Sequence, residues 1–327
     1  MVYYITVLKA LAACLITNSH YTGIYPSDIF ANGGLIGDVI FFAVSGYCLC
    51  NVQKSFFQWY RKRIYRVYLP VWVVTIVFLF LGFFSLSSNS FLYYFIYPSD
   101  YHFVGSIILL YIPFYFIMKN VRLRKNLPLV MLGIFLFAVI VYIFFYDYSY
   151  YHIDKVREPF IRFLFMESML LGSWFKLEDE QFRNRFSIKW CFFAILFFVI
   201  YFASKILFQK LVFLSEYQFV NQITIFILLY SIFRVFSGFD KKFCTLPETT
   251  RRCVNYISKI TLEIYLVQYV IIDLFRDIFI FPINWIVITG LILASSTVLH
   301  YVCIFLYYSI GKISVYLNEI TLRCDRK

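Results

Sequence analysis

The chain has 327 residues, of which 62% are hydrophobic, and its mean hydropathy is +0.76. Soluble globular domains are about 45–50% apolar, so this composition excludes an ordinary soluble protein and predicts an integral membrane protein. Only 15% of the residues are charged, and the 30 Lys and Arg outnumber the 18 Asp and Glu. Because the excess lies in short segments between apolar stretches, it argues against a nucleic-acid partner.

Ten apolar stretches approach the roughly 20 residues that a helix needs to cross a bilayer core of about 30 Å. They cover residues 3–21, 31–52, 67–84, 103–118, 127–146, 158–175, 188–208, 219–236, 254–272 and 284–310. We therefore predict a single all-α membrane domain over residues 1–327, built as a bundle of about ten transmembrane helices with no fused soluble domain.

The basic residues between these stretches predict an orientation. Every second gap and the C-terminal tail carry most of the Lys and Arg, whereas the other gaps hold only Lys155, Arg157, Lys205, Lys210 and Arg276. The positive-inside rule then places both termini in the cytoplasm. We expect a multi-pass protein of the cytoplasmic (inner) cell membrane. The eight cysteines show no paired or metal-ligand spacing, so we expect reduced thiols, no metal site and no bound cofactor.

The first stretch carries two ionisable residues, Lys9 and His20, eleven positions apart. Since a helix turns about 100° per residue, this spacing is about three turns, and both side chains share one face roughly 16 Å apart along the axis. Ionisable side chains inside a membrane helix are costly and commonly functional. A snorkelling Lys9 and an interfacial His20 are the alternatives, but the shared face favours a common path.

The second stretch contains the sequence Phe41-Phe42-Ala43-Val44-Ser45-Gly46-Tyr47. A Ser-Gly step allows two membrane helices to approach closely, so close packing is the simplest interpretation of this motif.

Residues 56–70 follow, in which basic and aromatic residues alternate on an amphipathic segment that leads into the third stretch. One interpretation is an interfacial helix that holds anionic lipid headgroups. The other is a cytoplasmic pocket for a phosphate-bearing ligand, because guanidinium groups match phosphate geometry. Arg63 and Arg66, three positions apart and nearest the membrane, are the best candidates.

Other ionisable residues lie in apolar stretches. Glu263 needs a partner or a proton, which leaves a functional and a structural role equally open. Arg162 and Glu167 are five positions apart, an awkward helical spacing for mutual pairing, which favours a structural network. His152 and His300 belong to no pattern that predicts a function.

These residues resemble the membrane-bound acyltransferase-3 family, which includes bacterial polysaccharide O-acetyltransferases and the enterobacterial-common-antigen type of O-acetyltransferase. That family opens with a basic residue, ten intervening positions and a histidine, as Lys9 and His20 do, although arginine is its commoner first member. A Phe-Phe-x-x-Ser-Gly-Tyr/Phe motif follows, similar to residues 41–47. An Arg-x-x-Arg entry to the third span comes next, similar to Arg63 and Arg66.

Two later stretches are similar to the family as well. Residues 102–111, beginning with His102, resemble its His-x-Trp-Phe segment with an eroded aromatic pattern. Residues 258–268 resemble its Ser-Tyr-x-Ile-Tyr-Leu-x-His motif. Gln268 stands where that histidine is common, so we expect no second catalytic imidazole there.

The resemblance implies an integral-membrane O-acyltransferase that moves an acyl group, here acetyl, from the co-substrate acetyl-CoA (acyl-CoA) to a hydroxyl of a cell-surface polysaccharide or a lipid-linked glycan. His20 would be the general base, and an acyl-histidine intermediate stays open. Lys9, with Arg63 and Arg66, would bind phosphates or stabilise developing negative charge. The predicted donor- or substrate-binding set is Ser45, Arg63, Arg66, His102 and Glu263.

The predicted orientation places the basic pocket in the cytoplasm and His20 toward the outside. We therefore expect the thioester arm to thread through the bundle. The rival hypotheses are a transporter or flippase of glycan precursors, in which Lys9, His20 and Glu263 line a polar route, and a non-catalytic scaffold. The expected partners are acyl-CoA, the glycan acceptor and membrane lipids; a homo-oligomer is compatible with the sequence, which leaves the oligomeric state open.

Overall fold

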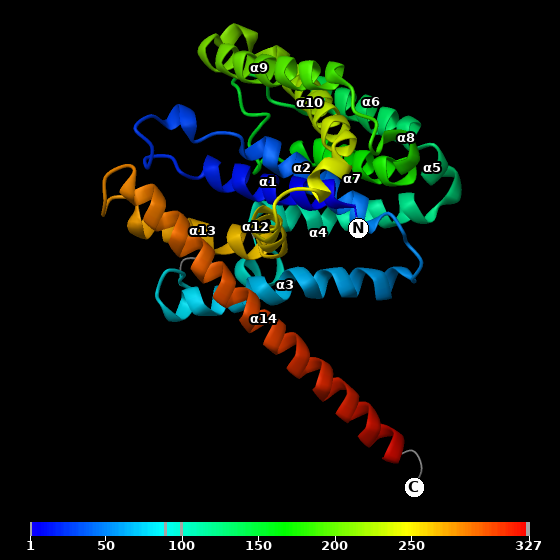
Figure 1. Ribbon diagram of the computed structural model, residues 1–327, viewed down its shortest axis with the longest axis vertical. Helices are drawn as coiled ribbons and strands as arrows, with labels where there is room; N and C mark the ends of the chain where they lie inside the picture. The colour runs from blue at the N-terminus through cyan, green and yellow to red at the C-terminus, as the bar shows by residue number, and fades with distance from the viewer. Residues whose placement is uncertain (1, 88–89, 99–100, 325–327) are drawn as a thin grey trace.

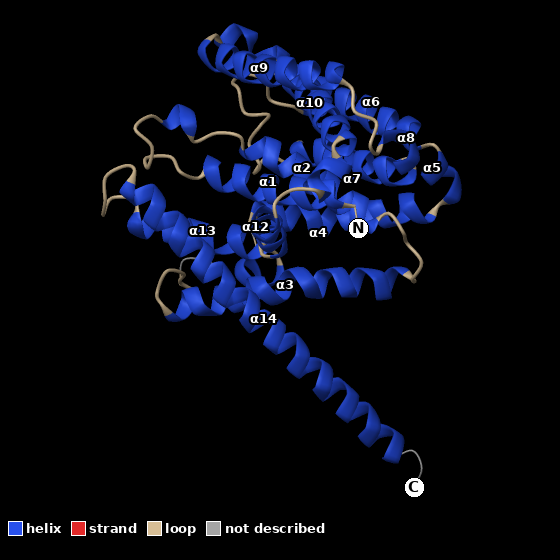
Figure 2. Cartoon of the chain, in the orientation of Figure 1, coloured by secondary structure: helices blue, strands red, loops and turns tan. Residues whose placement is uncertain are grey.

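The computed structural model describes residues 2–324 apart from 88–89 and 99–100, with the backbone alone over 310–324. This part of the chain is helical and contains no strand (Figure 2). The basic tail residues Arg326 and Lys327 lie outside it. In chain order the elements are α1 (Tyr3–Ser19), η1 (Asp28–Phe30), α2 (Gly34–Leu49), α3 (Phe56–Phe80), η2 (Leu92–Ile96), α4 (His102–Lys119), α5 (Val121–Lys125), α6 (Leu127–Phe145), α7 (Ile161–Leu177), α8 (Asp179–Phe182), α9 (Ile188–Lys210), η3 (Val212–Tyr217), α10 (Phe219–Gly238), α11 (Asp240–Cys244), α12 (Glu248–Lys259), α13 (Thr261–Phe275) and α14 (Ile283–Cys324).

Seven segments of the described chain are long and apolar enough to cross a membrane, as expected for a multi-pass membrane protein. They are Asp28–Leu49, Phe56–Phe80, His102–Lys119, Leu127–Phe145, Ile188–Lys210, Phe219–Gly238 and Ile283–Ser309. Each of the ten predicted stretches contains a helix, but α1, α7 and α13 have only 17, 17 and 15 residues. The count of about ten spans and the cytoplasmic location of both termini therefore stay predictions.

Two predicted boundaries differ from the observed helices. The third span was expected from residue 67, whereas α3 begins at Phe56 and continues through Pro70 to Phe80; the basic segment is thus the first half of the same helix. The stretch 254–272 is two helices, because α12 ends at Lys259 and α13 begins at Thr261. Charged residues of α12 such as Arg252 favour the membrane interface, while α13 is apolar enough to be buried.

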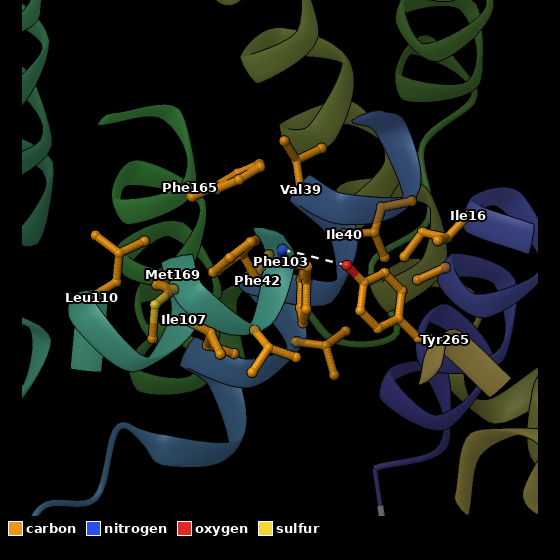
Figure 3. Close-up of a cluster of buried hydrophobic side chains, with 14 of the residues drawn as sticks. Ile16, Val39, Ile40, Phe42, Phe103, Ile107, Leu110, Phe165, Met169 and Tyr265 are labelled. Atoms are coloured by element: carbon orange, nitrogen blue, oxygen red, sulfur yellow. Dashed lines mark hydrogen bonds between the residues drawn. The ribbon is translucent and has the colours of Figure 1, made fainter. Parts of the chain in front are cut away.

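Glycines hold α2 against its neighbours. A Cβ atom on Gly46 would lie 1.9 Å from the carbonyl oxygen of Met169 in α7, and one on Gly172 would lie 1.8 Å from that of Ala43. Only glycine allows the two backbones to approach so closely, which is the packing role predicted for the Ser-Gly step. Figure 3 shows the resulting core, in which Phe42 of α2 stacks on Phe165 of α7 with ring centroids 4.2 Å apart.

Helix α1 is anchored at its N-terminal end by α11. The backbone N–H groups of Tyr3 and Tyr4 both donate to Oδ1 of Asp240 at 2.8 Å. The first N–H groups of a helix have no partner within it, and a carboxylate there also stabilises the positive end of the helix dipole. Asp240 itself lies 3.7 Å from Nε of Arg183. One residue, 237 positions from Tyr3 and 236 from Tyr4, thus fixes where α1 begins.

Figure 1 shows the two ends of the bundle. The N-terminus, α5 and α8 lie at one end, on the right of the view, and the loops 20–33 and 276–282 lie at the other, on the left. We call these the N-terminal end and the far end. Helix α1 runs from the first to the second, so Lys9 lies within the bundle and His20 at its far end.

Candidate active site

A cavity of about 610 Å³ lies between α1, α2, α3, α4, α13 and α14. Its wall is largely apolar and includes Phe41, Tyr111 and Ile304. The structure brings five of the predicted site residues together in this wall, namely Lys9, Ser45, Arg63, Arg66 and Glu263. Lys259, the last residue of α12, lines it too. The separate helices that carry these residues meet here because α13 packs on α1, α3 and α14.

Four cations therefore face one cavity: Lys9, Arg63, Arg66 and Lys259. Within the described part of the chain none of them lies in an ion pair. Nε of Arg63 is moreover buried without a hydrogen-bond partner. Lys9 and Arg63 are partly buried, whereas Arg66 and Lys259 are exposed. Since a cation removed from water without a counter-ion is costly, this cavity suits an anionic ligand, and guanidinium groups suit phosphate oxygens.

The local sequence of α3 explains why its arginines reach the cavity. Arg63 and Arg66 are three positions apart and so lie on one face of the helix. Trp59, one turn earlier, is buried against the ring of Tyr111, 5.7 Å away between centroids. The Arg63 guanidinium lies 5.5 Å from the Trp59 ring centroid. The aromatic residues between the basic ones thus orient the helix face, and a cation–π contact supports the guanidinium.

Glu263 and His300 form a pair in the same wall. Oε1 of Glu263 lies 2.7 Å from Nδ1 of His300, whose side chain is 24% exposed. This contact provides the partner that a carboxyl in an apolar helix needs. The local sequence around His300 indicates no function, because its partner is 37 positions away on another helix and no local motif marks the pair.

His20 lies elsewhere. It follows the last residue of α1 and is not in the wall of the large cavity. Its ring centroid lies 4.4 Å from that of Tyr269 on α13. Among the described residues, no side chain hydrogen-bonds to its ring nitrogens. Lys9 and His20 thus occupy different surroundings, so the structure does not bring the predicted base and the predicted phosphate ligands together.

A small cavity of about 10 Å³ lies between these two regions. Such a volume holds about one water molecule. It shares Phe41, Phe103, Thr261 and Leu262 with the large cavity, and it extends to Thr17 and Gln268. Because Thr17 is three residues before His20, the small cavity ends within one helical turn of the histidine.

We call this small cavity, which is lined by Thr17, Phe41, Phe103, Tyr265 and Gln268 among others, the passage. Not all of its polar groups have hydrogen-bond partners. The hydroxyl of Thr17 donates to Oε1 of Gln268 at 2.8 Å. Gln268 is fully buried, and its Nε2 has no partner. A buried amide donor without an acceptor is unfavourable, so the passage is suited to a ligand that brings a carbonyl oxygen.

Aromatic residues narrow the passage. The ring of Phe103 lies 4.9 Å from that of Phe41 and 5.5 Å from that of Tyr265. The backbone N–H of Phe103 donates to the hydroxyl oxygen of Tyr265 at 3.4 Å, the dashed line in Figure 3. These contacts close the route between the large cavity and His20 in this structure.

Three other predicted residues lie outside the large cavity. His102 begins α4 beside Phe103 but does not contribute to the wall. Arg162 donates to the hydroxyl oxygen of Tyr97 at 3.0 Å, and its structural role stays a prediction. Glu167 lines a separate cavity of about 280 Å³ between α6, α7 and α10. The roles assigned to the site residues stay predictions.

The chain matches a family model described as an acyltransferase domain, over residues 2–308. The match includes every residue of the large cavity and of the passage. Comparison with curated proteins and with solved structures gives no match.

Proposed function

The chain belongs to the membrane acyltransferase-3 family, and we propose that it is an O-acetyltransferase that moves acetyl from acetyl-CoA to a hydroxyl of a cell-surface polysaccharide or a lipid-linked glycan. The observation that carries the proposal is the cavity of four unpaired cations, which adjoins a passage leading toward His20. No contact among the described residues favours the transporter alternative.

The shape of the donor fits the two adjoining cavities. Coenzyme A has several phosphates at one end and a thioester at the end of a long, thin arm. The phosphates would lie against Arg63, Arg66 and their neighbouring lysines, where charge-assisted hydrogen bonds are strong. The arm would extend past Phe41 and Phe103, whose rings must turn aside to admit it. The thioester would then lie near Gln268, one helical turn from His20.

At that position the residues can perform acyl transfer. His20 accepts the proton of the acceptor hydroxyl as its oxygen attacks the thioester carbonyl carbon, a type of assistance worth about 10²–10⁴ in rate. Nε2 of Gln268 donates a hydrogen bond to the carbonyl oxygen as negative charge develops on it. When the intermediate collapses, the C–S bond breaks, and the thiolate takes the proton from the His20 imidazolium. The products are an ester and the free thiol of coenzyme A.

Complementation of a strain that lacks this gene tests the proposal. We expect the wild-type chain to restore ester-linked acetyl on the surface glycan and His20→Ala, at equal membrane levels, to restore none. Cys14→Ser is the matched control, because Cys14 lies on the same helix and is exposed. Full activity of His20→Ala would refute its role as the base. Loss of surface glycan from the deletion strain, with an unchanged acetyl content per unit of the glycan that remains, would instead identify a transporter.

A further inference from the structure

The proposed reaction gives no role to the pair formed by His300 and Glu263. His300 lies on α14 where this helix lines the cavity, and Glu263 lies in the first turn of α13. Both line the wall that also contains the four cations. The Glu263 side chain is 9% exposed and that of His300 is 24% exposed. The histidine thus covers the carboxylate and itself faces the cavity.

A carboxylate at this place needs an explanation. Glu263 is the acidic side chain among the described residues of a wall otherwise suited to phosphates. A bare carboxylate would repel a phosphate, and the repulsion is strong where water is scarce. The 2.7 Å contact between Oε1 of Glu263 and Nδ1 of His300 removes this conflict when the ring carries both of its protons, because the imidazolium then balances the carboxylate charge and donates Nδ1–H to it. The same bond fixes the imidazole and leaves Nε2 as its remaining polar atom.

We propose that His300 and Glu263 form a phosphate-binding dyad, in which the imidazolium form of His300 donates its Nδ1–H to Glu263 and its Nε2–H to a phosphate oxygen of the acyl donor. This inference rests on the proposed function, since the ligand is the phosphate-bearing donor. Glu263 is then a positioning residue and His300 a binding residue. The dyad adds a directed hydrogen bond to the point charges of Lys9 and Lys259, so it orients the donor as well as attracting it.

The dyad makes an unusual prediction about paired substitutions. His300→Ala exposes the Glu263 carboxylate to the phosphate and should weaken coenzyme A binding at least about tenfold, since both a charge-assisted bond and a shield are lost. Glu263→Gln keeps an acceptor for Nδ1–H and should weaken binding less than about threefold. The double variant His300→Ala/Glu263→Gln should bind better than His300→Ala alone, because its bare carboxylate is gone. A merely structural pair would show the opposite, with the double variant no better than the worse single variant.

A comparison of two ligands tests whether His300 contacts a phosphate of the donor. Binding is measured on the purified full chain in phosphatidylcholine nanodiscs, with coenzyme A and with pantetheine, which has the same arm and no phosphate. The loss caused by His300→Ala should be seen with coenzyme A and be absent with pantetheine. An equal loss with both ligands would overturn the phosphate assignment. Unchanged coenzyme A binding in His300→Ala would overturn the dyad itself.

Two further outcomes distinguish other failures. If the wild-type chain binds no coenzyme A, the proposed donor is wrong and the inference fails with it. A second outcome is that phosphatidylglycerol in the nanodisc displaces coenzyme A. If His300→Ala then weakens retention of that lipid but leaves coenzyme A binding unchanged in phosphatidylcholine alone, the dyad binds the phosphate of a lipid headgroup. That result would refute the donor dyad. The expected result is that coenzyme A affinity depends on His300 in both lipid mixtures.

Discussion

Replacing Arg63 by alanine tests the donor cavity directly, because the same helix provides a matched control. Arg63 lines the cavity with a buried, unpartnered Nε, whereas Arg61 is exposed and outside it. A hydrogen bond to a charged group contributes about 1.5–3 kcal/mol, and each 1.4 kcal/mol changes affinity about tenfold. We therefore expect Arg63→Ala to weaken coenzyme A binding about 10- to 100-fold. Arg61→Ala should change it less than about threefold, since exposed charges are screened.

Cys48 provides the assay, since its thiol is exposed and lines the same cavity. In a parent variant that keeps Cys48 and has Ser at its other seven cysteines, the rate of alkylation by N-ethylmaleimide reports access to the cavity. Acetyl-CoA, which has no free thiol to consume the maleimide, should slow this alkylation in the parent and in Arg61→Ala at similar concentrations, and in Arg63→Ala only at much higher ones. Equal protection of the two arginine variants would refute phosphate binding by Arg63. A parent that acetyl-CoA never protects would refute the cavity as the donor site.

Two further predictions concern packing and catalysis. Gly46→Ala places a Cβ atom 1.9 Å from the Met169 carbonyl oxygen, and the forced displacement should lower stability by about 1–3 kcal/mol, measured as the thermal unfolding midpoint in detergent. Gly133→Ala, whose Cβ meets no atom within 4 Å, is the control and should not lower it; equal losses would contradict the close contact of α2 and α7. Gln268→Leu should lower kcat for acetyl transfer about 10²–10³-fold with coenzyme A affinity unchanged, because it removes a donor that acts on the reacting carbonyl. Weaker coenzyme A binding with kcat intact would place Gln268 in donor binding instead.

The sequence predicts the helices well because each is marked by local hydropathy, and it predicts the basic wall because Lys9, Arg63 and Arg66 are conspicuous in apolar surroundings. It fails where a property depends on contact between distant helices. His300 looked unremarkable because its role comes from Glu263, 37 positions away. The Gln268 amide is held through its Oε1 by the Thr17 hydroxyl, 251 positions away, while its Nε2 has no partner. The apolar stretch 254–272 does not reveal the break between α12 and α13, because a single residue, Ile260, separates the two helices.

Periodicity alone placed Lys9 and His20 on one helix face, and the structure shows why a shared face does not mean a shared site. Helix α1 passes from the cavity to the far end, so its length separates the two residues. Eleven residues at about 1.5 Å each give roughly 16 Å along the axis. Asp240 fixes the start of this helix and Gln268 contacts it near its end. The separation is therefore set by a helix that is held at both ends.

This fixed separation bears on which donor the protein can use. In an acyl phosphate the carbonyl is bonded directly to the phosphate oxygen. If its phosphate lay against Arg63, the carbonyl would be held in the large cavity, roughly 16 Å short of His20 when measured along α1 from Lys9. A donor that uses both regions at once needs phosphates and thioester at opposite ends of a long arm, thin enough to pass Phe41 and Phe103. Coenzyme A thioesters have this form, so the distance between the cations and the imidazole favours them over compact activated acyl groups.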